Sequence, residues 1–373
     1  MYKFIALIAF AVFFMAGLVA FKDDITAENL KYLFKYINTS PQELEESEYT
    51  IRLSAPGDVQ AGMFREDFAV LYGDSFSMYT FSDELLYTQP VYMSYPKMVI
   101  SQKGVLCYDV GGSSLKVFNS FSQLWELTFE YPIIHADIND NGYVSVVASE
   151  QGVQAAVYVY DQNGNHIYKW TTSDKFVVCA SLSDDRIPYV AVCTVKSENG
   201  DYSGEVITLK TDEKSIFDSK KLGNVLPLQS GCSDDGTYSI LSESSVMVYN
   251  RNTDEISSYS FGRDALRMYR TGGKYLTLAL NENKIANESD IVVLNKACKE
   301  EYTVTVSGRL MDMVMDEDKI YVLTMGTLHI FAPERKEYKN IAVSDNFKRV
   351  YISNTGQVVL LSEERVIAVY IEM

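Results

Sequence analysis

The sequence predicts an all-β protein, an eight-bladed β-propeller, with seven blades as the alternative. The main observation is a short phrase of alternating apolar residues, followed at once by a polar turn and a second strand-like run. It recurs eight times, at residues 78–81, 115–118, 157–160, 206–209, 246–249, 291–294, 328–331 and 366–369. The ends of successive copies lie 37, 42, 49, 40, 45, 37 and 38 residues apart, a period typical of four-stranded blades. Aromatic residues make up 13% of the chain, which suits pleated, half-buried surfaces.

One repeat, residues 226–261, shows how a complete blade is expected to form. Polar turns at 234–236 and 250–254 carry Asp, Asn and Gly, the residues that favour tight hairpins. The four strands expected around these turns are residues 227–232, 238–241, 246–249 and 256–261. One repeat therefore accounts for one four-stranded blade.

The last repeat supplies only three strands before the chain stops, at residues 349–353, 357–362 and 366–371. Upstream of the first full blade, the stretch from Tyr49 to Leu53 has strand character but no blade of its own. We expect residues 49–53 to complete the C-terminal blade, residues 347–373, because this pairing closes the ring and leaves no open edge strand.

The N-terminal residues differ in kind from the rest of the chain. An uncharged apolar run extends from Phe4 to Phe21, about 27 Å as a helix and close to the thickness of a bilayer core. A cleaved signal peptide is the alternative, but the best cleavage site, at Leu18 to Ala20, has a large residue where a small one is preferred. Lys3 precedes the run and Lys22 is followed by two acids, which favours a cytoplasmic N-terminus and an extracytoplasmic body.

A short amphipathic segment follows the apolar run. Leu30, Leu33, Phe34 and Ile37 recur at helical spacing and share one face. We interpret it as a stalk helix that packs its apolar stripe on the ring. A coiled-coil or membrane-surface contact is the alternative. The expected division is residues 1–22 as membrane anchor, 23–47 as stalk and 48–373 as propeller.

Three phrases carry a resemblance to a known family. They are Val105 to Ser113, with the sequence Tyr-Asp-Val-Gly-Gly at its centre, Tyr131 to Ile134, and Tyr160 to Gly164. The chain resembles an uncharacterised, domain-of-unknown-function family of Gram-positive bacterial proteins along nearly its whole length. The resemblance implies one N-terminal membrane span and a WD40-like or quinoprotein-like propeller. It supplies no catalytic residue.

Charge narrows the expected partners. With 33 basic and 50 acidic side chains, the net charge is −17, and such a body repels phosphate backbones. We therefore expect no nucleic-acid partner.

The segment from Asp137 to Gly142 resembles the start of a calcium-binding loop, with alternating oxygen donors and a turn glycine. It makes Asp137, Asn139 and Asn141 weak calcium candidates. The pattern fails at the twelfth position, Ala148, where a calcium loop needs Glu. Similar acidic turns recur in other blades, so a hairpin turn is the favoured interpretation.

No catalytic constellation is evident, and we predict no catalytic residue and no cofactor. The histidines, His135, His166 and His329, lie in different repeats without ligand spacing, and no nucleophile elbow is present. Two tryptophans are too few for the repeated tryptophans of a quinoprotein. Cys179 and Cys193 flank one hairpin turn symmetrically, so they are the one pair with disulfide potential.

These observations predict an anchored extracytoplasmic binding or scaffold module that holds a protein, peptide or glycan at the cell envelope. The alternative is a cell-surface hydrolase, lyase or quinone-dependent enzyme with its site in the central channel. An insertion from Lys196 to Gly204, with Glu198, Asn199 and Asp201, lengthens one loop and points to a binding rim.

Overall fold

The computed structural model describes residues 51–52, 59–72, 74–80, 84–198, 200–233, 235–263, 265–281, 287–316, 319–335, 337–344, 346–363, 365–369 and 371. Regular structure in these residues is β-strand throughout, and Glu48–Met373 forms one compact unit. The predicted membrane helix and stalk helix lie outside the described residues.

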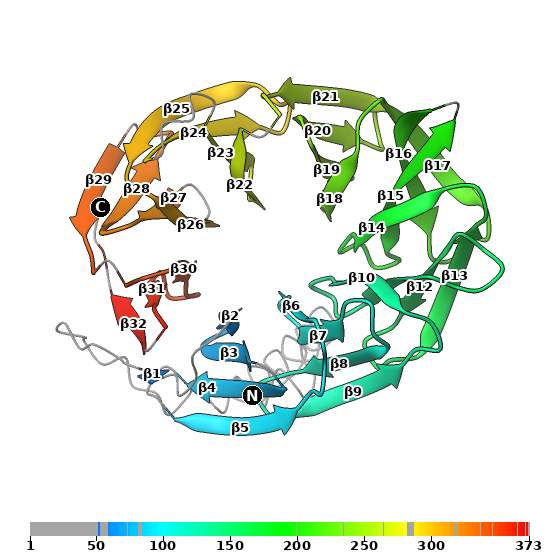
Figure 1. The fold of residues 1–373 in the computed structure, drawn as a ribbon, viewed down its shortest axis with the longest axis horizontal. Helices are drawn as coiled ribbons and strands as arrows, with labels where there is room; N and C mark the ends of the chain where they lie inside the picture. The colour runs from blue at the N-terminus through cyan, green and yellow to red at the C-terminus, as the bar shows by residue number, and fades with distance from the viewer. Residues whose placement is uncertain are drawn as a thin grey trace, which may run out of the picture. The chain divides into compact units, whose positions relative to one another are not determined.

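The described strands form eight antiparallel sheets of four strands each, set radially around a central axis (Figure 1). This confirms the predicted eight-bladed propeller and excludes seven blades. Seven sheets use four consecutive strands, ordered from the centre outward. The blades are numbered from first to eighth in the chain order of their innermost strands. These strands are β2 (Val59–Phe64), β6 (Pro96–Ile100), β10 (Ile133–Ile138), β14 (Phe176–Leu182), β18 (Pro227–Cys232), β22 (Leu266–Gly272), β26 (Leu310–Asp316) and β30 (Arg349–Ile352).

The two middle strands of each blade are the most apolar. The second strands are β3 (Asp67–Tyr72), β7 (Val105–Asp109), β11 (Val144–Ala148), β15 (Tyr189–Glu198), β19 (Thr237–Ser242), β23 (Tyr275–Leu280), β27 (Lys319–Thr324) and β31 (Val358–Leu361). The third strands are β4 (Ser75–Thr80), β8 (Ser114–Phe118), β12 (Ala155–Tyr160), β16 (Asp201–Lys210), β20 (Ser245–Asn250), β24 (Glu288–Asn295), β28 (Thr327–Ala332) and β32 (Arg365–Val369). Every copy of the repeated phrase falls on a third strand, as far as its residues are described; the last residue of the first copy, Phe81, lies outside them. Strands such as β7 and β11 are buried on both faces because neighbouring blades stack against both sides of each sheet.

The outer strands alternate between half-buried and exposed residues, as in β9 and β21, because only one of their faces packs on a neighbouring blade. They are β5 (Leu85–Pro90), β9 (Gln123–Thr128), β13 (His166–Thr172), β17 (Ile216–Gly223), β21 (Glu255–Ser260), β25 (Glu300–Ser307) and β29 (Glu337–Ala342).

The eighth blade joins both ends of the propeller. Its order is β1-β32-β31-β30, and β1 (Ile51–Arg52) supplies the outer strand. Ile51 pairs with Val366 and Arg52 with Arg365. Ile51 and Arg52 belong to the stretch that we expected to close the ring, and the other residues of that stretch lie outside the described residues.

The core lies between adjacent blades. Phe76 of the first blade stacks on Phe118 of the second, with ring centroids 4.1 Å apart and an interplanar angle of 14°, and both side chains are fully buried. Burial of one such side chain stabilises the fold by about 1.5–3 kcal/mol.

The Tyr-Asp-Val-Gly-Gly phrase joins the second blade to the third. The Asp109 carboxylate accepts a hydrogen bond from the backbone N–H of Tyr95, at 2.7 Å. Gly111 donates to the Ile133 carbonyl at 2.7 Å, and Ile133 donates to the Gly112 carbonyl at 2.8 Å. Gly111 has a φ of +77°, which favours glycine. A Cβ at Gly112 would lie 2.1 Å from the Asp109 carboxylate, so the tight turn requires both glycines.

Candidate binding site at the mouth of the central channel

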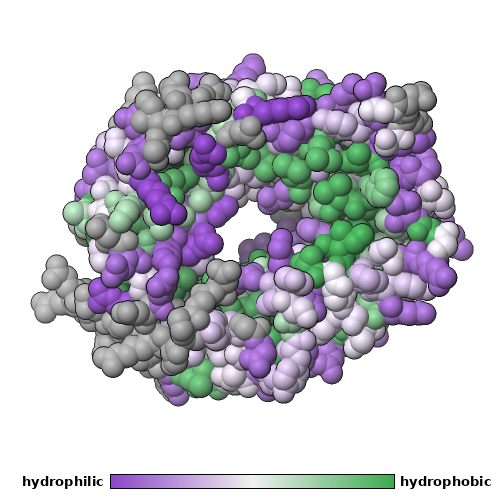
Figure 2. Space-filling model, viewed as in Figure 1, coloured by the Kyte–Doolittle hydropathy of each residue, from purple (hydrophilic) through white to green (hydrophobic). Residues whose placement is uncertain are grey.

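Each inner strand begins at the same face of the ring, because it follows a loop from the outer strand of the preceding blade. We call this the entry face. A central channel opens through the ring (Figure 2). The side chains at the beginnings of the inner strands therefore form the mouth of this channel on the entry face.

One side of the mouth is apolar. Ile134 on β10, Phe176 on β14 and Leu228 on β18 are 39%, 56% and 47% exposed, and Leu226, just before β18, is 38% exposed. We call these four residues the apolar arc. Figure 2 shows apolar surface beside the opening on the side of β10, β14 and β18. A gathering of large exposed apolar side chains marks an interaction surface more often than single ones do.

A β-bulge explains why two of these side chains are exposed. The register with the second strand shifts between Ile133 and His135 in the third blade, and between Pro227 and Gln229 in the fifth. The extra residues are Ile134 and Leu228. A bulge leaves one residue unpaired and re-aims its side chain, here at the mouth of the channel.

The opposite side of the mouth is basic. Exposed cations precede or begin the inner strands of the sixth, seventh and eighth blades: Arg263, Arg267, Arg309, Lys348 and Arg349. We call these five residues the basic arc, and Figure 2 shows hydrophilic surface beside the opening near β26 and β30. Arg267 occupies the same bulge position in β22 as Leu228 does in β18. Cations gather here although the chain carries a net charge of −17.

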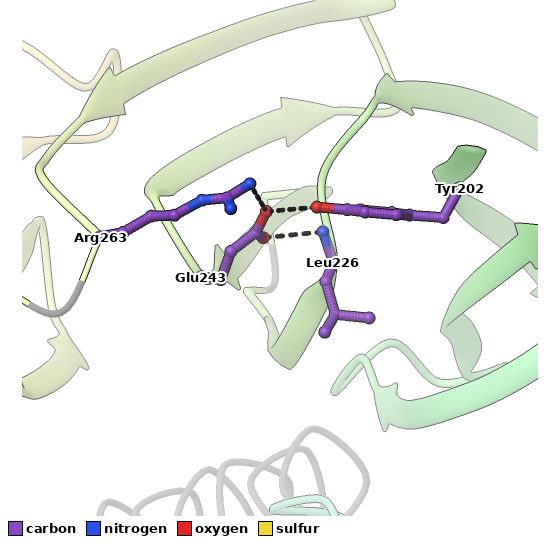
Figure 3. A pocket seen from close by; sticks show the side chains of 4 residues that line it. All are labelled: Tyr202, Leu226, Glu243 and Arg263. Atoms are coloured by element: carbon purple, nitrogen blue, oxygen red, sulfur yellow. Dashed lines mark hydrogen bonds and ion pairs between the residues drawn. The ribbon is translucent and has the colours of Figure 1, made fainter. Parts of the chain in front are cut away.

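A pocket of about 230 Å³ lies where the two arcs meet, lined by Tyr202, Leu226, Glu243 and Arg263 (Figure 3). One carboxylate oxygen of Glu243 accepts a hydrogen bond from the Tyr202 hydroxyl at 3.0 Å, and the other accepts from the Leu226 backbone N–H at 2.7 Å. The Arg263 guanidinium lies 3.7 Å from Glu243, and its side chain is 72% exposed. Glu243 thus holds an apolar and a basic residue beside one small cavity.

The insertion noted in the sequence contributes to this pocket. It lengthens β15 and β16 to ten residues each, and the paired strands extend to Glu198 opposite Asp201. Tyr202 follows directly and reaches Glu243 in the next blade. The insertion therefore supplies one wall of the pocket through Tyr202. Of the other predicted loop residues, Asp201 is not among the lining residues, whereas Asn199 and the side chain of Glu198 lie outside the described part of the structure.

The calcium candidates lie at a joint between the third and fourth blades. Asn139 donates to the Ser183 carbonyl at 2.7 Å and accepts from the Tyr143 N–H at 2.8 Å. Asn141 donates to the Asp184 carbonyl at 2.6 Å. Among the described residues, no group of three or more His, Cys, Asp or Glu side chains is arranged to hold a metal ion. The amide groups thus act as turn and joint residues, as the favoured hairpin-turn interpretation expects, and calcium binding stays the untested alternative.

Asp137, the third calcium candidate, lies on β10 beside this joint. Its carboxylate accepts a hydrogen bond from the Leu182 N–H at 3.3 Å. Burial raises the pKa of Asp137 to about 7, and the neighbouring carboxylates of Asp184 and Asp140 add to the shift. The carboxyl group of Asp137, on an inner strand of the ring, is therefore expected to change charge near neutral pH.

The structure does not bring the three histidines together. His135 lies on β10, and burial together with Lys97 lowers its pKa to about 4. His166 begins the outer strand β13 near Tyr160. His329 lies within the seventh blade, where its ring contacts Thr324 and Asn340 at 3.0 and 2.8 Å.

Cys179 and Cys193 face each other across β14 and β15, as the symmetric spacing suggested. Both are buried, and every cysteine of the chain is a free thiol in the structure. A disulfide between them is thus not formed here.

A model of the DUF5711 family, described as a family of unknown function, matches residues 45–371. The chain belongs to this family. The match spans all eight blades, so the family is defined by the propeller and not by one motif.

Solved structures with the same fold come from very different proteins. BamB from Moraxella catarrhalis is 13% identical, with a TM-score of 0.54, and the match covers 86% of this chain and 98% of BamB. The Dos1 propeller is 10% identical, with a TM-score of 0.60 and coverage of 86% and 93%. The Pan2 WD40 domain from Neurospora crassa is 12% identical, with a TM-score of 0.50 and coverage of 88% and 96%. At such identities, the likeness shows the fold alone.

Among curated protein sequences, none matches this chain significantly. Within the part of the chain that the structure describes, no helix is both long and apolar enough to cross a membrane. The apolar run from Phe4 to Phe21 lies outside that part.

Proposed function

We propose that this DUF5711 protein is a membrane-anchored, extracytoplasmic binding module whose ligand site is the mouth of the channel on the entry face. The observation that carries the proposal is the pairing of the apolar and basic arcs around one opening, with the Glu243 pocket at their junction. A rigid ring that presents loop and strand-end side chains on one face is suited to recognition.

The sequence supports the proposed anchor and location. The apolar run from Phe4 to Phe21 is long enough to span a bilayer, and the flanking charges favour an external propeller. Protease added to intact protoplasts, from which the cell wall has been removed, is expected to digest the propeller. Full protection of the propeller, with digestion only after lysis, would contradict this orientation.

The alternative, an enzyme with its site in the channel, has less support. Asp137 has a raised pKa, but its carboxylate already accepts a backbone hydrogen bond, and the histidines lie apart. A binding surface therefore accounts for more of the geometry than a catalytic site does.

Cross-linking in cells tests the binding site. A photoreactive amino acid replaces Leu228 in the full-length protein, and the matched control replaces Ile256, which is 39% exposed on the outer strand of the same blade. We expect a discrete cross-linked partner from position 228 and none from position 256. Equal capture at both positions, or capture from Ile256 alone, would show that the mouth is not the binding site.

A further inference from the structure

We propose that the occupant of the channel mouth is a protein segment in which large apolar side chains and carboxylates lie close together, and that this segment crosses from the apolar arc to the basic arc. This inference rests on the proposed function and adds the chemistry of the ligand. The apolar side chains would cover the third to fifth blades, and the carboxylates would face the sixth to eighth blades.

The basic arc favours carboxylates. Arg309 is exposed, and its guanidinium makes no ion pair among the described residues. Within the described residues, the ion-pair partner of Arg349 is the Asp312 carboxylate at 4.0 Å, and the Arg349 side chain is half exposed. Guanidinium groups bind carboxylates through two parallel hydrogen bonds, so these side chains offer donors to an acidic segment.

The charge of the rest of the chain makes the basic arc selective. With a net charge of −17, the surface as a whole disfavours an acidic partner, whereas the five cations of the basic arc attract one locally. A basic partner would instead find favourable charge over much of the surface and unfavourable charge at this arc. Electrostatic complementarity therefore selects both the partner and its orientation.

The apolar arc distinguishes a protein segment from other anions. A nucleic acid or a phosphate-rich polymer could pair with the basic arc but would leave Phe176 and Leu228 facing a highly charged chain. These side chains are 56% and 47% exposed, and an apolar side chain of a partner removes their surface from water. A protein segment alone among these partners supplies both kinds of group.

The pocket at the junction fits the crossing point. Leu226 belongs to the apolar arc and Arg263 to the basic arc, and both line the same 230 Å³ cavity. Arg263 has five N–H donors, whereas its ion pair with Glu243 is long, at 3.7 Å. One partner side chain can thus enter the cavity while a neighbouring carboxylate bonds to Arg263.

Selection from random peptides tests this inference directly. The full-length protein, held in mild detergent, is immobilised and used to select phage-displayed random twelve-residue peptides. The same selection is run on Arg309→Glu and Leu228→Ser, and on the matched controls Lys299→Glu and Ile256→Ser. Lys299 is an exposed cation in the turn after β24, on the face opposite the mouth, and Ile256 lies on the outer strand β21.

We expect enriched peptides to combine Asp or Glu with Leu, Ile or Phe and to lack Lys and Arg. A representative enriched peptide should bind Arg309→Glu and Leu228→Ser at least tenfold more weakly, and both controls within twofold of wild type. Enrichment of basic or purely polar peptides, or no enrichment, would overturn the inference. Peptides that lose binding in Leu228→Ser but not in Arg309→Glu would leave the binding site in place and refute its acidic ligand. Peptides unaffected by either change would refute the site itself.

Discussion

The two sides of the channel differ below the mouth as well as at its rim. Beneath the apolar arc, β14 and β18 meet through neutral groups, and the Ser181 hydroxyl donates to the Ser230 hydroxyl at 2.9 Å. Beneath the basic arc, the buried Asp312 carboxylate lies 2.8 Å from Arg270 and accepts from the Val350 N–H at 3.1 Å. The same blade architecture therefore supports a neutral contact between β14 and β18 on one side and a charged network on the other.

The comparison shows how a repeated fold places different side chains at equivalent positions around one opening. Leu228 and Arg267 sit at the same bulge of successive inner strands, so the backbone delivers each side chain to the same place. The side chain alone decides whether that part of the mouth is apolar or basic.

Removal of Asp312 is expected to cause the largest loss of stability. Asp312→Ala leaves the buried Val350 N–H without its acceptor and Arg270 without its ion-pair partner. Because the Arg270 side chain is 42% exposed and stays partly hydrated, we expect the free energy of unfolding to fall by about 2–4 kcal/mol. Urea denaturation followed by circular dichroism measures the loss. Asp212→Ala, at an exposed ion pair, serves as the control and should change stability by less than about 1 kcal/mol. Equal small losses would mean that no charged network supports the basic side.

Asp137 lies on the apolar side, and we expect removal of its ionisable carboxyl to stabilise the protein, whereas removal of Asp312 destabilises it. Its folded-state pKa, about 7, lies above the ordinary value of about 3.9, so the folded chain holds a proton that the unfolded chain releases. The contribution of Asp137 to stability should therefore fall as pH rises from about 4 to 7.

Asp137→Asn keeps an acceptor for the Leu182 N–H and removes this dependence. We expect the variant to be more stable than wild type by about 2–4 kcal/mol at pH 8 and equal to it near pH 4. Urea denaturation across this pH range measures both values. A variant less stable than wild type at pH 8 would show that the wall needs the charge.

The joint between the third and fourth blades gives an intermediate effect. Asn139→Ala leaves the Ser183 carbonyl and the Tyr143 N–H without a partner and should cost about 2–3 kcal/mol. Asn163→Ala, in an exposed turn of the same blade, is the control and should be nearly neutral. Calorimetry with calcium is expected to give no heat and no shift in melting temperature. A calcium-dependent rise that Asn139→Ala abolishes would restore the metal interpretation.

The smallest effect is expected at the junction of the two arcs. Tyr202→Phe removes one donor to the half-buried Glu243 and should lower stability by about 0.5–1 kcal/mol, measured by thermal denaturation. Tyr92→Phe, at a hydroxyl on a side chain that is 77% exposed, should have no effect. A loss of several kcal/mol would mean that the pocket is a structural joint between blades and not an open site.

Much of the fold could be predicted from the sequence because third strands are buried on both faces and produce a clear apolar phrase. The blade expected over residues 226–261 forms as β18 to β21, with strand ends within one residue of those expected. The closure of the ring by the strand at Ile51 could also be predicted, because the C-terminal repeat supplies only three strands and needs a fourth from elsewhere in the chain.

The candidate site at the mouth of the channel could not be predicted in the same way. Strand alternation has a period of two, and a bulge shifts that alternation by one residue, so the exposure of Leu228 does not follow from the pattern around Pro227. The residues of the pocket are also far apart in the chain: Tyr202 belongs to the fourth blade, Glu243 to the fifth, and Arg263 precedes the sixth. Alignment of the repeats would have placed Leu226 and Arg263 in equivalent loops, and this was the signal available.

The salt dependence of peptide binding tests the two-sided mouth most directly. The affinity of one enriched acidic and apolar peptide is measured at low and high ionic strength for wild type, Leu228→Ser and Arg309→Glu. Salt screens exposed charges but not apolar contacts, so Leu228→Ser should weaken binding by a similar factor at both ionic strengths. Arg309→Glu should weaken it strongly at low ionic strength and far less at high. If the two variants show the same dependence on salt, the division of the mouth into an apolar and a basic side is wrong.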